Sequence, residues 1–360
     1  MKKHLGNLAR VLISVGILVY LFNGIFEKQA AEHFAAKHIN PATLHWAERV
    51  QTVWSVGPHA LAEVFQEVQP LWFVLAIACI GVVVLCGVVR WQWILRVQGL
   101  EIPWNRAISI NFIGLFFNSF MLGATGGDVM KALYVARETH HKKAEAVATV
   151  IVDRIIGLLV LFVIALVMML SFWHRVYDDA RLRTFTVFTL AFVLGTVSIT
   201  ALSFWKGFAD RLPGLRALLQ RLPKYDTMQR MIEACRVYAS HPVVLGKTAL
   251  ITVVVHVGSM LAIVCIGKGL GITSASFTDY FLYLPIVNSI SAIPISISGF
   301  GVREGMYVAM FSRVGVPGAV ALAMSLLGYF ANLAWSLVGA GFYITHRKEL
   351  PTAEQIERDE

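Results

Sequence analysis

Residues 277–313, FTDYFLYLPIVNSISAIPISISGFGVREGMYVAMFSR, are apolar enough for a membrane interior but too broken to form two ordinary spans. Prolines and glycines interrupt the stretch, and either residue weakens or breaks a helix. No charged side chain lies between Asp279 and Arg303. The stretch is therefore predicted to be a re-entrant hairpin, which enters and leaves the membrane on one face. Such irregular backbone survives at membrane depth only when it is buried in protein or lines a polar cavity.

The chain around this stretch is rich in long apolar runs. Of its 360 residues, 57% are hydrophobic and 15% are charged, whereas about a quarter of a soluble domain is charged. Each run is close to the ~20 residues that a helix needs to cross the hydrocarbon core. The composition thus indicates a multi-span membrane protein. The runs are Leu8–Phe26, Leu71–Val89, Ala146–Trp173, Thr184–Trp205, Thr248–Leu270 and Ala319–Thr345.

The formal net charge of +9 is concentrated in short segments beside the apolar runs. This distribution follows the positive-inside rule and places both termini in the cytoplasm, with residues 27–69 outside. The location that fits is a bacterial inner membrane. Basic segment 206–247 has amphipathic patterns, which indicate helices on the anionic inner leaflet or a cytoplasmic helical hairpin. No nucleic-acid-binding signature accompanies the basic residues, so no nucleic-acid partner is expected.

The apolar run Ala107–Leu122 is shorter than a full span, and both of its flanks are basic. A complete crossing would place one basic flank outside, against the positive-inside rule. The run leads into the glycine-rich turn 123–128. It is therefore predicted to form another re-entrant hairpin, which opens to the cytoplasm. The spans on either side of residues 277–313 then require the second hairpin to enter from the opposite face.

The predicted fold is an all-α integral membrane protein with about six transmembrane helices, two oppositely oriented re-entrant helical hairpins and an inverted repeat. Asn118-Ser119 in the first hairpin and Asn288-Ser289 in the second each lead into a glycine-rich, charged turn. Inverted repeats in transporters place the substrate site near the membrane midplane. The expected segments are 1–69 (first span and external amphipathic segment), 70–173 (first repeat), 174–247 (linking span and basic cytoplasmic segment), 248–346 (second repeat) and 347–360 (cytoplasmic tail).

Two charged pairs belong to the first half of the chain. Asp128 and Lys131 are three residues apart, on one face of a helix that begins at the Gly126-Gly127 turn. Asp128 there either complements the helix dipole or contacts a ligand. Asp153-Arg154 lies inside a span, where charges are costly and normally face a cavity or a partner. Arg154 is expected to reach the interface, to approach an anionic head group or to pair with Asp128.

Arg303-Glu304 is the most specific charged pair, because it follows a long uncharged stretch inside the second hairpin. Gly299 and Gly301 allow close approach of the backbone and expose N–H groups. An arginine on such a turn can bind phosphate through two parallel hydrogen bonds. The alternative is an internal Arg–Glu pair that stabilises the hairpin. His256, within an apolar span, is expected to be a hydrogen-bonded packing residue in preference to a proton relay.

Three stretches resemble the lysylphosphatidylglycerol synthase transmembrane, or flippase, family: residues 123–132, GATGGDVMKA; residues 152–159, VDRIIGLL; and residues 293–305, IPISISGFGVREG. The resemblance extends over about residues 70–345, although many relatives carry Pro-Gly where this chain has Gly123-Ala124. It implies a protein that moves phospholipid-like molecules between leaflets. Relatives stand alone or are fused to an aminoacyl transferase domain. This chain resembles the stand-alone form and is not expected to synthesise aminoacylated lipid.

We therefore expect a lipid transporter and not an enzyme, with a phospholipid or lipid-linked substrate and no catalytic residue, metal or cofactor. The oligomeric state is left open, a homodimer included. One alternative is an integral membrane transferase or hydrolase that acts on polyprenyl or lipid phosphate, with Asp128 and Asp153 as candidate bases. Another is a scaffold that sequesters lipid. The candidate substrate-binding residues are Asn118, Asp128, Lys131, Asp153, Arg154, Asn288, Ser289, Arg303 and Glu304; the candidate turn residues are Gly126, Gly127, Gly299 and Gly301.

Overall fold

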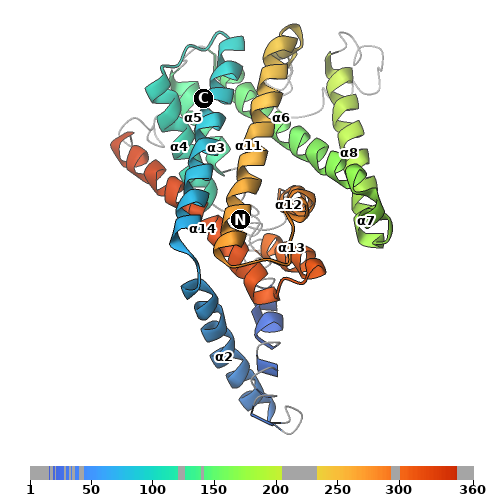
Figure 1. The fold of residues 1–360 in the computed structure, drawn as a ribbon. Coiled ribbons are helices and arrows are strands. Elements are labelled where there is room, and N and C mark those ends of the chain that lie inside the picture. Colours follow the sequence, from blue (N-terminus) through green and yellow to red (C-terminus); the bar gives the residue numbers. More distant parts are fainter. Residues whose placement is uncertain are drawn as a thin grey trace. The chain divides into compact units, whose positions relative to one another are not determined.

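The computed structural model describes residues 44–120, 126–138, 142–204, 233–292 and 301–346, together with 16, 19–20, 22–27, 30–31, 34 and 37–39. Within these residues the regular secondary structure is entirely helical, which confirms the all-α fold (Figure 1). The helices are α2 Trp46–Gln66, α3 Pro70–Val97, α4 Trp104–Phe120, α5 Gly126–Glu138, α6 Lys143–Ser171, α7 Trp173–Tyr177, α8 Ala180–Phe204, α11 Pro242–Gly269, α12 Phe277–Ser291, α13 Val302–Phe311 and α14 Gly318–His346, with 3-10 turns η3 Tyr238–Ser240 and η5 Ser312–Val314.

Helices α3, α6, α8, α11 and α14 are long and apolar enough to cross a membrane. Each coincides with a predicted span, and the chain is a multi-pass membrane protein. Most of the predicted first span, Leu8–Phe26, lies outside the described residues. The same holds for most of the basic segment 206–247 and for the tail 347–360.

Helix α3 extends beyond its predicted end. The apolar run that predicts this span is Leu71–Val89. In the structure, α3 continues to Val97. Trp91 is fully buried in a cluster with Ile110 of α4 and Val135 of α5. Neighbouring helices thus cover this end of α3, and the helix continues past the charged Arg90.

Each predicted hairpin contains two short helices that pack together, α4 with α5 and α12 with α13. Helix α4 has 17 residues and α12 has 15, fewer than the ~20 of a full span. The connecting residues, 121–125 and 293–300, lie outside the described part of the chain, and Gly299 is among them. That the pairs enter the membrane from opposite faces stays a prediction.

The described residues form two compact units. The first unit comprises the residues up to Ile80 and Gly258–Ala334. The second unit comprises Gly81–Phe120, the described residues from 126 to Val257, and the chain from Trp335. Helices α3, α11 and α14 each contribute residues to both units. The expected inverted repeat and the five-segment division stay predictions.

In the first unit, α2 provides the amphipathic helix that was expected in segment 27–69. Its Val53 and Gly57 are buried, whereas Trp46 and Val50 are exposed. Gly57 is covered by the ring of Phe26, so a larger residue would not fit there.

In the second unit, glycines let helices approach closely. A Cβ atom at Gly127 on α5 would collide with the backbone oxygen of Gly114 on α4. A Cβ at Gly339 on α14 would collide with the backbone oxygen of Phe112, also on α4. Helix α5 packs on α6 as well, and α8 returns beside α6 (Figure 1). The start of α5 is thus held against two neighbouring helices.

The residues before α11 are anchored to α3. The Tyr238 hydroxyl donates a hydrogen bond to the Ile94 backbone oxygen at 3.0 Å. Burial raises the pKa of Tyr238, so the phenol stays protonated and keeps this donor. The side chain of Gln98 likewise donates to the Ala234 backbone oxygen at 2.6 Å.

Candidate functional site

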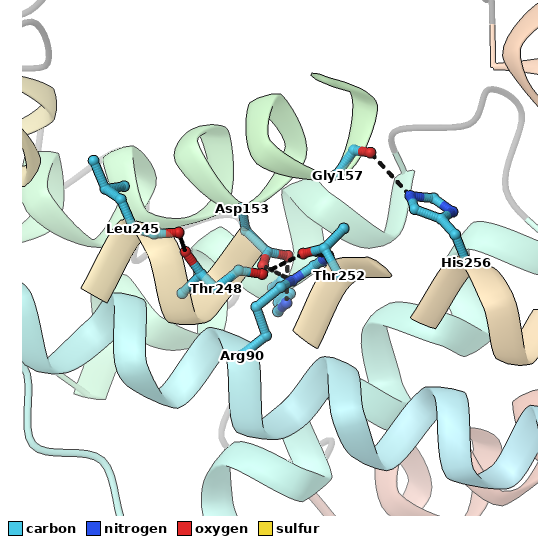
Figure 2. Close-up of polar contacts among 8 residues, drawn as sticks. Arg90, Asp153, Gly157, Leu245, Thr248, Thr252 and His256 are labelled. Atoms are coloured by element: carbon cyan, nitrogen blue, oxygen red, sulfur yellow. Dashed lines mark hydrogen bonds and ion pairs between the residues drawn. The ribbon is translucent and has the colours of Figure 1, made fainter. Parts of the chain in front are cut away.

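Arg90 of α3 lies at the centre of a charged cluster in the second unit. Its Nε donates to Oδ1 of Asp153 on α6 at 2.7 Å, and its Nη1 donates to Oγ1 of Thr252 on α11 at 3.1 Å (Figure 2). The Arg90 and Asp153 side chains are 14% and 13% exposed. The Thr252 hydroxyl donates in turn to the Thr248 backbone oxygen at 2.6 Å. One partly buried guanidinium therefore links three helices.

Lys131 of α5 approaches the same carboxylate. Its Nζ lies 3.6 Å from Oδ2 of Asp153 and 4.1 Å from the centroid of the Trp91 ring. The lysine side chain is 8% exposed. Asp153 is thus shared by two cations, Arg90 at one oxygen and Lys131 at the other.

Asp128 and Arg154 form the third ion pair of this cluster, with Arg154 Nε 2.9 Å from Asp128 Oδ2. Asp128 lies in the first turn of α5, where its carboxylate also complements the helix dipole. The expected pairing of Arg154 with Asp128 is therefore present. Asp128 and Lys131, three residues apart on α5, meet the adjacent Arg154 and Asp153 on α6.

Asn118 of α4 fixes the start of α5. Its Oδ1 accepts a hydrogen bond from the Gly127 backbone N–H at 2.9 Å. The first N–H groups of a helix have no partner within the helix, and this side chain satisfies one of them. Gly126 and Gly127 are both buried at the contact. Direct binding of substrate by Asn118 stays a prediction.

In the first unit, Glu304 of α13 is fully buried and both of its oxygens are engaged. Oε2 accepts from the Gly301 N–H at 2.7 Å, which closes the start of α13. Oε1 accepts from Arg303 Nη2 at 2.6 Å and from the hydroxyl of Ser325 on α14 at 3.3 Å. Gly301 has a φ of 83°, a conformation that glycine adopts without steric cost. The pair is internal, one of the two arrangements expected from the sequence.

Arg303 is held by α14 as well as by Glu304. Its Nε donates to the Ser325 hydroxyl at 3.2 Å, and its guanidinium carbon lies 5.3 Å from the centroid of the Tyr329 ring. Stacking on an aromatic face suits the planar guanidinium. The side chain is 18% exposed, so these contacts orient the arginine and still leave part of it accessible.

The other predicted residues have different surroundings. Ser289 on α12 is fully buried, and its hydroxyl has no hydrogen-bond partner among the described residues. The neighbouring Asn288 side chain is partly buried. His256 Nε2 donates to the Gly157 backbone oxygen at 3.0 Å (Figure 2), which confirms the expected hydrogen bond.

Sequence reasoning missed Arg90, Thr252 and Ser325. For Arg90 a signal was available, because Trp91 and other apolar residues follow it and continue the helical pattern. Thr252 and Ser325 are ordinary hydroxyl residues within apolar spans, and nothing local distinguishes them. Their partners are set by the packing of separate helices.

Comparison with known proteins agrees with this architecture. The family described as "Lysylphosphatidylglycerol synthase TM region" matches residues 44–341. The chain is 24% identical over 319 residues to a UPF0104 membrane protein of Pyrococcus horikoshii. The aligned region covers 83% of this chain and 94% of that protein. No solved structure matches. The comparisons support a lipid-related role in a membrane, and both charged clusters lie within the matched residues.

Proposed function

The chain belongs to the family of the lysylphosphatidylglycerol synthase transmembrane region, and we propose that it is a flippase that moves phospholipid-like molecules between leaflets. The membrane is that of a bacterial cell, with both termini of the chain in the cytoplasm. The proposal rests chiefly on one observation. Among the described residues, the cluster of the second unit holds three basic side chains, Arg90, Lys131 and Arg154, against two carboxylates. Such an excess suits an anionic head group.

Arg154 is the member of this cluster best suited to contact lipid phosphate. Its side chain is 44% exposed, far more than that of Arg90. Asp128 orients the guanidinium through Nε, and a guanidinium can bind phosphate with two parallel hydrogen bonds. Arg90, which is less exposed, holds the Asp153 carboxylate in place through its hydrogen bond to Oδ1. In the first unit, Arg303 would contact phosphate in the same way, with Glu304 and Tyr329 orienting it.

A liposome assay with fluorescently labelled phospholipids tests the proposal. Arg154→Ala and Arg303→Ala should each slow translocation about tenfold or more, because a hydrogen bond between charged groups contributes about 1.5–3 kcal/mol. Arg49→Ala is the matched control, since Arg49 is exposed and lies 3.9 Å from the exposed Glu27. Rates that stay at the wild-type level in both test variants would remove these arginines from the mechanism.

The same liposomes distinguish transport from chemistry. Mass spectrometry of the lipids after incubation should show unchanged phospholipid. A product that forms with the wild type and is absent with Asp128→Asn would favour the transferase or hydrolase. Lipid that co-purifies without translocation would favour a scaffold.

A further inference from the structure

The three basic side chains of the second-unit cluster differ in how closely each is paired with a carboxylate. Arg90 is 2.7 Å from Asp153, and Arg154 is 2.9 Å from Asp128. Lys131 has the longer contact, 3.6 Å, with a carboxylate that Arg90 already engages. If all three basic side chains are protonated, the excess positive charge resides on Lys131, whose side chain is the most buried of the five.

A buried excess charge is unfavourable, because burial penalises the charged form of an ionisable group. It can be removed in two ways: the cation loses a proton, or an anion binds beside it. Arginine keeps its proton in proteins, whereas a buried lysine can lose one. Lys131 lies outside the five spanning helices, and burial lowers the pKa of its ammonium group below the usual range.

Any test has to distinguish the protonation of Lys131 from the protonation of the other ionisable groups near it. Helix α4 carries one charged residue, Arg106, which pairs with Glu138 at the last residue of α5. His256 on α11 already donates to Gly157. The charged groups that act on Lys131 are Asp153 on α6, Arg90 on α3 and Asp128 on α5. The same three helices also carry other charged or titratable residues: Arg96, Tyr134, Arg137, Glu138, Lys143, Glu145 and Arg154.

We propose that Lys131 binds a proton when the phosphate of a lipid enters this cluster and releases it when the phosphate leaves. The inference rests on the proposed function and extends it to the coupling of transport. The step is a proton transfer alone: the neutral amine takes one proton from solution and becomes ammonium. The phosphate supplies the negative charge that the cluster lacks, and one proton accompanies each lipid bound.

Reciprocal linkage fixes the sign of the effect. If phosphate raises the pKa of Lys131, then protonation of Lys131 strengthens phosphate binding by the same factor. Affinity should rise about tenfold for each pH unit by which the pH falls, between the pKa of the lipid-bound state and the lower pKa of the free state. Outside that window the affinity should not depend on pH.

Titration calorimetry with dihexanoyl phosphatidylglycerol, in buffers of different ionisation enthalpy, measures the protons taken up on binding. This lipid is a phosphodiester and carries its charge throughout the range of about pH 6 to about pH 9, so any uptake belongs to the protein. The wild type should take up close to one proton within the window. Lys131→Arg, whose charge is permanent, should bind the lipid without proton uptake and without pH dependence. His256→Gln should take up protons as the wild type does.

The outcomes separate this inference from the proposed function. Lipid binding by the wild type with no proton uptake and constant affinity would overturn the role of Lys131 and leave the flippase proposal intact. Uptake that persists in Lys131→Arg would assign the proton to another group and also overturn it. A wild type that neither binds nor translocates any anionic phospholipid would overturn the proposed function itself.

Discussion

At Glu304, one carboxylate serves two structural purposes. It closes the first turn of α13 through the Gly301 N–H, and it orients Arg303. The residue is fully buried, so water does not replace these contacts, and both purposes depend on the charge and the hydrogen bonds of the carboxylate. An Arg–Glu pair of this kind can stabilise the hairpin and still present the arginine to a ligand.

Glu304→Gln should lower the free energy of unfolding by about 3 kcal/mol, because removal of one partner from a buried pair leaves the other charge uncompensated. Chemical denaturation of the purified protein in detergent measures this difference. Glu27→Gln provides the control, since Glu27 and its partner Arg49 are exposed and 3.9 Å apart. That control should change stability by no more than about 0.5 kcal/mol. Equal losses in the two variants would contradict a special role for Glu304.

At the scale of elements, the contact between α4 and α5 depends on a missing side chain. Gly127 faces the backbone oxygen of Gly114, and its own N–H is bound by Asn118. The close approach places the first turn of α5, with Asp128, beside the neighbouring helices. The charged cluster therefore depends on the close contact between α4 and α5 as well as on its own residues.

Gly127→Ala should separate α4 from α5 and destabilise the protein by about 1–3 kcal/mol, the usual cost of overpacking. It should also slow lipid translocation, because Asp128 and Lys131 would move away from α6. Gly195→Ala on α8 is the matched control, since a Cβ there meets no atom within 4 Å. In that position alanine should be neutral or stabilise the helix by up to about 1 kcal/mol. A thermal stability for Gly127→Ala equal to that of the control would refute the argument.

For the whole molecule, the prediction that remains to be measured is the side of the membrane on which each segment lies. In a chain whose four native cysteines are replaced, single cysteines can be tested with a membrane-impermeant thiol reagent. Ser240→Cys and Ser274→Cys flank α11 at exposed positions and should react from opposite sides, cytoplasmic and external respectively. Both substitutions change little more than an oxygen to a sulfur.

The hairpin of α4 and α5 adds a second comparison. Glu101→Cys before α4 and Lys142→Cys after α5 should react from the same side as Ser240→Cys, because a hairpin returns the chain to the face that it left. Reaction of these two positions from opposite sides would mean that α4 crosses the membrane alone. The positive-inside rule would then fail for the basic flanks of this segment.

The sequence by itself determined the membrane class, the five spans that the structure describes, and the short helices between them. The cost of charges and unpaired backbone in lipid makes apolar length a local, readable property. Asp128, Arg154, Arg303 and Glu304 were identified for the same reason, since charges within apolar stretches are conspicuous.

Only the tertiary structure decided which partner each charge has. Arg90 meets Asp153 and Thr252 across 63 and 162 residues of sequence, and Arg303 meets Ser325 on another helix. These contacts depend on how the helices pack, which no local pattern encodes. The apolar run of this span ends at Val89 in the sequence, whereas α3 continues to Val97 and Arg90 contacts partners on α6 and α11.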